Sequence, residues 1–254
     1  MSSFNHYITL IYQKSLSDLK AEARRGSLGI LWWIVEPLLY VSVFYVIFSL
    51  IFDRGGDNAI QNLLTGLIVW KWFDSCVRQS STSIITNAGL IRQVYIPKVI
   101  LPIMVVMTGT MKFAIIFAIL LVFLTINNGI PSSSWLTLPI IILIQFVVSL
   151  SIGAFAASIV PFFPDLRLLI DNGMTLLFFL SGIFFNIETV SVELQGYLYM
   201  NPMVGLIESY RTVLLNNELP DFKMLTIILS VSLLVLFLAI KLLARYDREY
   251  IKVI

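Results

Sequence analysis

The sequence has 254 residues, of which 58% are hydrophobic and only 13% are charged, and its formal net charge at pH 7 is +2. About a quarter of the residues in a soluble globular domain are charged, so this composition excludes an ordinary soluble domain and indicates a protein embedded in a lipid bilayer. Because Cys76 is the single cysteine, the chain cannot form an internal disulfide. Because His6 is the single histidine, few residues are available for metal binding or proton relay.

The first 25 residues predict an amphipathic helix rather than a signal peptide, because no apolar core is followed by a small-residue cleavage site. Apolar residues recur there at helical spacing: Phe4, Ile8, Ile11, Tyr12, Leu16, Leu19 and Ala23. Polar residues such as Lys14 and Asp18 occupy the other side. This pattern favours a helix lying in the membrane interface, with a helix packed on a partner subunit as the alternative.

Six segments are predicted to cross the membrane, so residues 1–254 are expected to form a single all-α transmembrane domain. The spans lie at about 31–52, 62–83, 99–126, 136–160, 168–186 and 223–244. Most contain the roughly 20 apolar residues that a helix needs to cross the hydrocarbon layer. Residues 187–222 are apolar only in short pieces, which predicts two short re-entrant helices before the last span.

The distribution of lysine and arginine predicts that both termini are cytoplasmic. In this orientation the inner segments carry Lys14, Lys20, Arg24, Arg25, Arg92, Lys98, Arg167, Lys241, Arg245, Arg248 and Lys252. The outer segments carry only Arg54, Arg211 and Lys223.

Two cytoplasmic segments combine prolines with aromatic, apolar and charged residues. They are "NAGLIRQVYIPKV", residues 87–99, and "PFFPDLR", residues 161–167. The prolines are typical of helix ends. The apolar side chains indicate a protein surface docked against these loops, or a helix that rests on the lipid headgroups.

Three charges fall inside the second predicted span. Lys71, Asp74 and Arg78 are spaced i, i+3 and i+7, so they share one helix face. A charge near the middle of the membrane costs a few kcal/mol unless it has partners or water. We therefore favour a cluster facing a conduit over a purely structural one. Three further charges raise the same question individually: Glu36, Lys112 and Asp171.

Several chemical classes have no motif in this sequence. It lacks a Gly-x-x-x-x-Gly-Lys-Ser/Thr phosphate loop, an Asp-x-Asp pair, a plausible Ser-His-Asp set and a His-Glu-x-x-His helix. We expect no catalytic residue, metal site or cofactor in this chain. The two halves of the chain do not look alike, which argues against an inverted-repeat transporter. Because six spans enclose little space, a conduit is expected between two copies related by a two-fold axis.

Five motifs carry a family resemblance. They are "RRGSLGILWWIVEPLL" at 24–39, "WKWF" in the second span, "LIRQVYIPK" after it, "FLSGIFF" closing the fifth span and "NPMVGLIESYR" in the outer segment. In this order they resemble the permease subunits of ABC-type polysaccharide exporters, which serve O-antigen, capsule and teichoic acid export. Many relatives have a proline where Gly182 stands, and glycine also permits a break in the fifth span.

The resemblance implies a homodimer in the bacterial inner membrane, joined to two copies of a separate subunit that binds ATP and Mg²⁺. Residues 1–25 would be its interface helix. The two cytoplasmic segments would contact the ATPase through Asn87, Leu90, Ile91, Arg92, Val94, Tyr95, Pro97, Pro164, Asp165 and Arg167. Residues 187–222 would form outer gate helices with Asn201, Pro202, Glu208 and Arg211. Glu208 and Arg211 lie one turn apart and are expected to pair.

The implied substrate is a lipid-linked polysaccharide, with O-antigen as the first candidate, and membrane lipid but no nucleic acid is implied as a further partner. The alternatives are a drug or small-lipid exporter of the same fold and a membrane scaffold without transport. Aromatic rings are candidates to stack on sugar faces along the channel: Trp33, Tyr40, Phe44 and Phe48 in the first span, and Phe178, Phe179, Phe184 and Phe185 around the end of the fifth. Lys71, Asp74 and Arg78 would line the same channel. The alternative for the rings is ordinary contact with lipid.

Overall fold

The computed structural model describes residues 2–24, 29–46, 58–129, 131–185 and 187–253. This part of the chain is helical and contains no strand. Its N-terminal half comprises α1 (Ser2–Arg24), η1 (Gly29–Leu31), α2 (Trp32–Tyr45), α3 (Ala59–Ser81), α4 (Ser83–Thr86), α5 (Ala88–Gln93) and α6 (Ile100–Asn128). Its C-terminal half comprises η3 (Ser133–Thr137), α7 (Leu138–Ile159), α8 (Leu166–Leu180), η4 (Ile187–Thr189), α9 (Val192–Leu198), α10 (Pro202–Leu214), α11 (Phe222–Arg245) and α12 (Tyr250–Val253).

Three helices in the described residues are long and apolar enough to cross a membrane. They span Ile100–Asn127, Ser133–Ile159 and Phe222–Arg245, and they agree with the third, fourth and sixth predicted spans. The other three predicted spans remain predictions. Helix α3 has 23 residues but carries charges, and α8, with 15 residues, is only about 22 Å long. The first predicted span begins with α2, and its remainder, from residue 47, lies outside the described residues.

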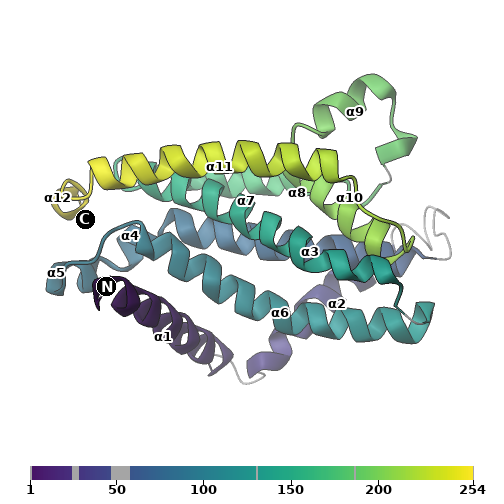
Figure 1. Cartoon of the computed structure of the whole chain (residues 1–254), viewed down its shortest axis with the longest axis horizontal. Coiled ribbons are helices and arrows are strands. Elements are labelled where there is room, and N and C mark those ends of the chain that lie inside the picture. The colour runs from purple at the N-terminus through teal and green to yellow at the C-terminus, as the bar shows by residue number, and fades with distance from the viewer. Residues whose placement is uncertain (1, 25–28, 47–57, 130, 186, 254) are drawn as a thin grey trace.

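The long helices form one elongated bundle (Figure 1). Helix α7 packs against α3 and α11, and α3 also packs against α6. Two glycines permit this close approach. A Cβ atom on Gly109 of α6 would stand 2.6 Å from the Cys76 sulfur of α3, and one on Gly153 of α7 would stand 2.8 Å from Ser80. Small residues at such crossings are typical of helix packing in membranes, where the hydrophobic effect does not press helices together.

The predicted amphipathic helix is present as α1, and it packs along α6 of its own chain. The buried Ser15 hydroxyl donates a hydrogen bond of 3.1 Å to the Met104 carbonyl, which fixes the two helices side by side. Ile8 and Tyr12 of α1 remain exposed. The helix therefore leaves part of its apolar surface uncovered.

The two termini lie at the same end of the bundle (Figure 1). Helices α4, α5 and α12 lie at this end as well, whereas α9 projects beyond the bundle toward the opposite end. A second apolar core, separate from that of the bundle, joins these short helices to the ends of α6, α7 and α11, and includes Ile84, Ile91, Leu101, Ala157, Leu243 and Tyr250. The arrangement brings the two proline-containing segments of the sequence to one end.

Candidate functional site

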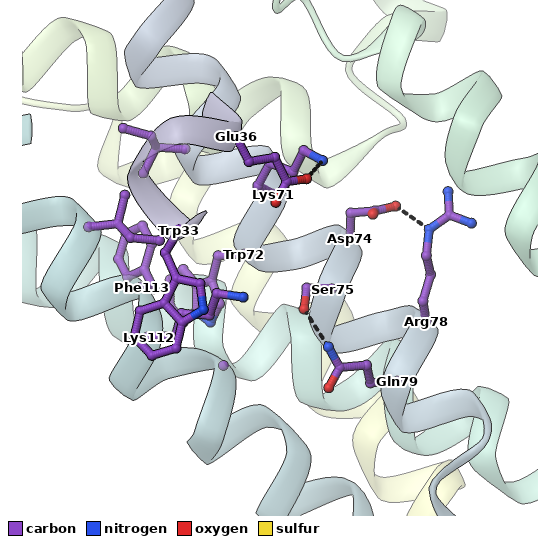
Figure 2. A pocket seen from close by; sticks show the side chains of 13 residues that line it. Trp33, Glu36, Lys71, Trp72, Asp74, Ser75, Arg78, Gln79, Lys112 and Phe113 are labelled. Atoms are coloured by element: carbon purple, nitrogen blue, oxygen red, sulfur yellow. Dashed lines mark hydrogen bonds and ion pairs between the residues drawn. The ribbon is translucent and has the colours of Figure 1, made fainter. Parts of the chain in front are cut away.

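A cavity of about 290 Å³ lies between α2, α3 and α6 (Figure 2). Its wall combines charged, polar and aromatic side chains: Trp33, Glu36, Ile68, Lys71, Trp72, Asp74, Ser75, Arg78, Gln79, Gly109, Lys112, Phe113 and Ile116. The three charges that the sequence places on one face of the second span all line it. The prediction that they share a face is confirmed.

Lys71 of α3 forms an ion pair with Glu36 of α2, at 2.7 Å between Nζ and Oε1. Its ammonium group also lies 4.4 Å from the centre of the Tyr40 ring, a cation–π contact. Both charged side chains are part-exposed. The pair explains how α2 can carry a carboxylate in an otherwise apolar segment, because Lys71 compensates its charge.

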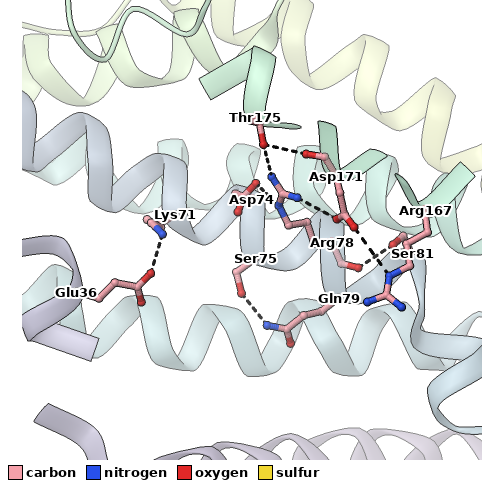
Figure 3. A network of polar contacts seen from close by, with 10 residues as sticks. All are labelled: Glu36, Lys71, Asp74, Ser75, Arg78, Gln79, Ser81, Arg167, Asp171 and Thr175. Carbon is pink, nitrogen blue, oxygen red and sulfur yellow. Dashed lines mark hydrogen bonds and ion pairs between the residues drawn. The ribbon is translucent and has the colours of Figure 1, made fainter. Parts of the chain in front are cut away.

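Arg78 joins α3 to α8 (Figure 3). Its Nε donates to Asp74 at 2.7 Å, and a terminal nitrogen donates to Asp171 at 2.9 Å. The other terminal nitrogen lies 3.3 Å from the Thr175 hydroxyl. Arg167 approaches the second oxygen of Asp171 at 3.9 Å. The guanidinium thus holds two carboxylates from different helices in one network.

Lys112 of α6 connects the cavity to α1. Its ammonium group donates a short hydrogen bond to Glu22 and lies 5.1 Å from the centre of the buried Trp33 ring. Glu36, Lys112 and Asp171, which stand alone in the sequence, therefore each have an opposite charge as a partner. Glu22 is not among the residues to which the sequence patterns assign a role. Its place on the polar side of the amphipathic helix was the only available signal.

Aromatic rings form the apolar wall of this cavity. Trp72 and Phe113 stack with their centroids 4.1 Å apart, and Phe117 continues the stack behind Phe113. The cavity therefore offers ring faces beside paired charges. Such a surface can accept hydroxyl groups through its polar atoms and apolar C–H groups through its rings, and its paired charges give it no strong net attraction for an ion.

The candidate channel aromatics come from two parts of the sequence. Trp33 and Tyr40 contact Lys112 and Lys71 as described, the side chain of Phe44 is not described, and Phe48 lies outside the described residues. In the other group, Phe178 packs against Phe179, Phe184 and the buried Trp70, with ring centroids 5.0–6.0 Å apart.

A second, more apolar hollow of about 620 Å³ lies between the end of α8 and α9. Phe185 lines it, together with Leu177, Leu180, Val190, Leu194, Tyr197, Leu198, Met200 and Asn201. Asn201 also caps α10: its side-chain oxygen accepts from the Met203 amide at 3.0 Å, and Pro202 occupies the first turn. Its side-chain nitrogen donates to the Ser181 hydroxyl at 2.8 Å, which ties α10 to the end of α8.

The expected ion pair between Glu208 and Arg211 is not formed, so that prediction is wrong. Glu208 accepts a hydrogen bond from the Tyr199 hydroxyl at 2.8 Å. Arg211 instead donates to backbone carbonyl oxygens of Asn62, Gly182 and Ile183. The carbonyls of Gly182 and Ile183 lie just after α8, where helical partners are missing, whereas that of Asn62 lies in the first turn of α3. Gly182 has a φ of +69°, so glycine supports the break of the fifth span.

The segment 87–99, which includes α5, presents only part of its apolar surface. Val94 and Tyr95 are 57% and 66% exposed, whereas Ile91 is 4% exposed and packs in the subunit's own core. Leu90 and Pro97 are half-buried, Arg92 is exposed, and Asn87 donates to the Ser83 carbonyl at 2.7 Å. In the second segment Pro164, Asp165 and Arg167 are all exposed. Val94 and Tyr95, not Ile91, are therefore the apolar groups available to a partner.

Comparison with known proteins gives a consistent match. The profile of the ABC-2 type transporter family matches residues 11–215. The chain is 30% identical over 203 residues to an O-antigen export system permease protein RfbA of Klebsiella pneumoniae. The aligned region covers 80% of this chain and 78% of that protein. The chain is 29% identical over 224 residues to RfbA of Myxococcus xanthus, covering 87% and 86%. It is 22% identical over 230 residues to the polysialic acid transport protein KpsM of Escherichia coli, covering 89% of each chain.

Proposed function

The chain belongs to the ABC-2 type transporter family, and on that premise we propose that it is the permease subunit of an exporter that moves a lipid-linked polysaccharide, with O-antigen as the first candidate, across the bacterial inner membrane. The relatives named for O-antigen export have the higher identities, and the relative named for polysialic acid transport is more distant.

The observation that best supports a transport role is the line of charges along α3. Lys71, Asp74 and Arg78 belong to a segment of the bundle that is otherwise largely buried and apolar, and they line a cavity with aromatic walls. Charged side chains inside a membrane protein are usually kept where water or a substrate passes. A scaffold without transport has no need for them.

The source of energy is proposed to be a separate ATP-binding subunit. The sequence contains no phosphate loop of its own, so ATP and Mg²⁺ would be bound by that partner. We propose two copies of the permease and two of the ATPase, because the cavity of one subunit is too small for a polymer to pass. The polysaccharide would then move through a path between the two permease copies.

The ATPase is proposed to bind at the end of the bundle that carries the two termini. This end holds the two proline-containing segments, and Val94, Tyr95 and Phe163 are exposed there (Figure 1). Lysines and arginines are concentrated in the segments assigned to this end, which supports a cytoplasmic location. Arg211 and the capped α10 would close the opposite, outer mouth.

A deletion experiment tests this function. A strain without this permease should still make the polysaccharide but should not display it, and the parent gene should restore display. Surface polysaccharide is measured by antibody labelling of intact cells, and total polysaccharide is measured after lysis. A catalytically inactive variant of the ATPase serves as a control, since it should give the same intracellular accumulation. Normal surface display in the deletion strain would refute the proposal.

A further inference from the structure

We propose that the C-terminal segment, residues 246–253, forms a bracket that joins the two ATPase-facing segments, 94–98 and 160–165, and that Asp247 and Tyr250 are the residues that position them. This inference rests on the proposed function, because that function is what assigns the ATPase to these segments. The bracket itself is built from contacts within this chain.

Asp247 holds the first segment. One oxygen of its carboxylate accepts a hydrogen bond of 3.1 Å from the backbone amide of Lys98, and the other lies 3.6 Å from the Lys98 ammonium group. The Lys98 side chain is fully buried, and its ammonium group makes no hydrogen bond to any described residue. Asp247 is therefore the carboxylate that compensates this buried charge, and its loss would leave the charge uncompensated.

Tyr95 adds a further contact to the same carboxylate. Its hydroxyl hydrogen-bonds to Asp247, and this bond, together with the negative charge of the carboxylate, raises the pKa of Tyr95 above its ordinary value. The ring of Tyr95 also lies 5.2 Å from the Lys98 ammonium group. Asp247 thus contacts two residues of the segment, one exposed and one buried.

Tyr250 holds the end of α7, where the second segment begins. Its side chain is fully buried, and its hydroxyl donates a hydrogen bond of 2.9 Å to the carbonyl of Ser158, near the end of α7. Carbonyls in the last turn of a helix lack intrahelical partners, so this bond satisfies a group that would otherwise need water. The ring of Phe162 packs against Tyr246 and Tyr250, at 5.7 and 5.0 Å between centroids.

The bracket is short and internally bonded. Only two residues separate Asp247 from Tyr250, and the amides of Glu249 and Tyr250 both donate to the Tyr246 carbonyl. The Tyr246 amide in turn donates to Leu242 of α11. A displacement of either ATPase-facing segment is therefore transmitted through a few ordered residues to the other segment and to α11. This would make the two segments respond to the ATPase as one body.

Two conservative variants test the bracket. Asp247→Asn keeps an oxygen that can accept from the Lys98 amide but removes the charge, and Tyr250→Phe keeps the ring but removes the hydroxyl. Glu249→Gln is the matched control, because its exposed side chain pairs only with Lys252 among the described residues. Hydrogen–deuterium exchange of the purified permease and polysaccharide exported per ATP hydrolysed by the full complex are measured for each.

Each bracket variant should speed amide exchange in both segments. Tyr250→Phe should lower export per ATP by roughly two- to tenfold, the range for loss of one ordinary hydrogen bond. Asp247→Asn should lower it at least as much, because it leaves the buried charge of Lys98 uncompensated. Glu249→Gln should match the parent in both measurements. Exchange confined to the segment that lost its own contact, or an unchanged ratio of export to hydrolysis, would overturn the bracket. A parent complex that exports no polysaccharide would instead count against the proposed function, which separates the two failures.

Discussion

The guanidinium of Arg211 in α10 donates a hydrogen bond of 2.7 Å to the carbonyl oxygen of Gly182, just beyond the end of α8. Another nitrogen of the same group reaches Ile183 at 2.8 Å and Asn62, at the start of α3, at 3.0 Å. One side chain therefore holds together three chain segments that are far apart in the sequence. Because its acceptors are backbone carbonyls, Arg211 stabilises the chain just beyond the C-terminal end of α8 without requiring particular side chains there.

Replacing Arg211 should destabilise the outer end of the subunit. Arg211→Ala leaves several carbonyls without a donor and should lower the free energy of unfolding by roughly 2–3 kcal/mol, since hydrogen bonds from charged donors are worth more than neutral ones. Arg211→Lys should recover only part of this, because an ammonium group cannot reproduce the planar fork. The measurement is the thermal unfolding midpoint in detergent. The exposed Arg167→Ala is the control, and an Arg211→Ala midpoint equal to that of the control would contradict the assigned role.

The ion pair between Lys71 and Glu36 gives a charge-exchange test. Lys71→Glu places two carboxylates together in the cavity and should lower the export rate per assembled complex by roughly fivefold, a modest effect because both side chains are part-exposed. Adding Glu36→Lys restores opposite charges at the same two positions and should recover most of the rate. If the double variant is slower than Lys71→Glu alone, the pair does not act as a pair in the transporting complex.

The ring of Tyr40 tests whether aromatic faces contribute to transport. Tyr40→Phe keeps the ring face and should export at nearly the parent rate. Tyr40→Leu keeps an apolar side chain but removes the face, and it should slow export by about fivefold if one ring contributes on the order of 1 kcal/mol. Both rates are normalised to the amount of assembled complex. Equal rates for the Phe and Leu variants would mean that this ring is an ordinary apolar contact.

Cysteine labelling tests the proposed orientation. In a Cys76→Ser background, Val192→Cys on α9 should react with a membrane-impermeant thiol reagent added to intact cells. Gln93→Cys at the end of α5 should react only after the membrane is opened. Both positions are exposed in the structure, so burial does not limit either reaction. Labelling of residue 93 in sealed cells would reverse the topology.

Much of the fold follows from patterns that act locally. Apolar length predicted the helices at 99–126, 136–160 and 223–244, and alternating apolar and polar faces predicted α1, because each of these signals depends only on nearby residues. The ion-pair partners of the charged residues could not be predicted from such local patterns. Glu36 and Lys71 are 35 residues apart, and Arg78 and Asp171 are 93 apart, so only the packing of helices brings them together.

Prediction from local spacing was wrong where a long-range contact competed with a short-range one. Glu208 and Arg211 have the spacing of a helical ion pair, but three backbone carbonyls, two of them beyond the end of α8 and without helical partners, outcompete the single carboxylate for the guanidinium. Asp247 and Tyr250 gave no signal, because a carboxylate and a tyrosine near a basic C-terminus resemble ordinary interfacial residues. Their contacts become visible only when α12 is placed beside α5.

Val94 and Ile91 provide a matched pair for testing the ATPase-facing surface. They lie three residues apart, but Val94 is exposed while Ile91 is buried in the core formed with α6, α7 and α11. Ile91→Ala creates a cavity and should lower the free energy of unfolding by about 2–4 kcal/mol. Val94→Asp should leave stability nearly unchanged but should reduce recovery of the ATPase, because it places a charge where an apolar contact is proposed. Thermal unfolding of the permease and co-purification of the ATPase separate the two effects. If Val94→Asp retains the ATPase as well as the parent does, the partner does not rest on this surface. The remaining candidate for its binding site is then the exposed set Phe163, Pro164, Asp165 and Arg167.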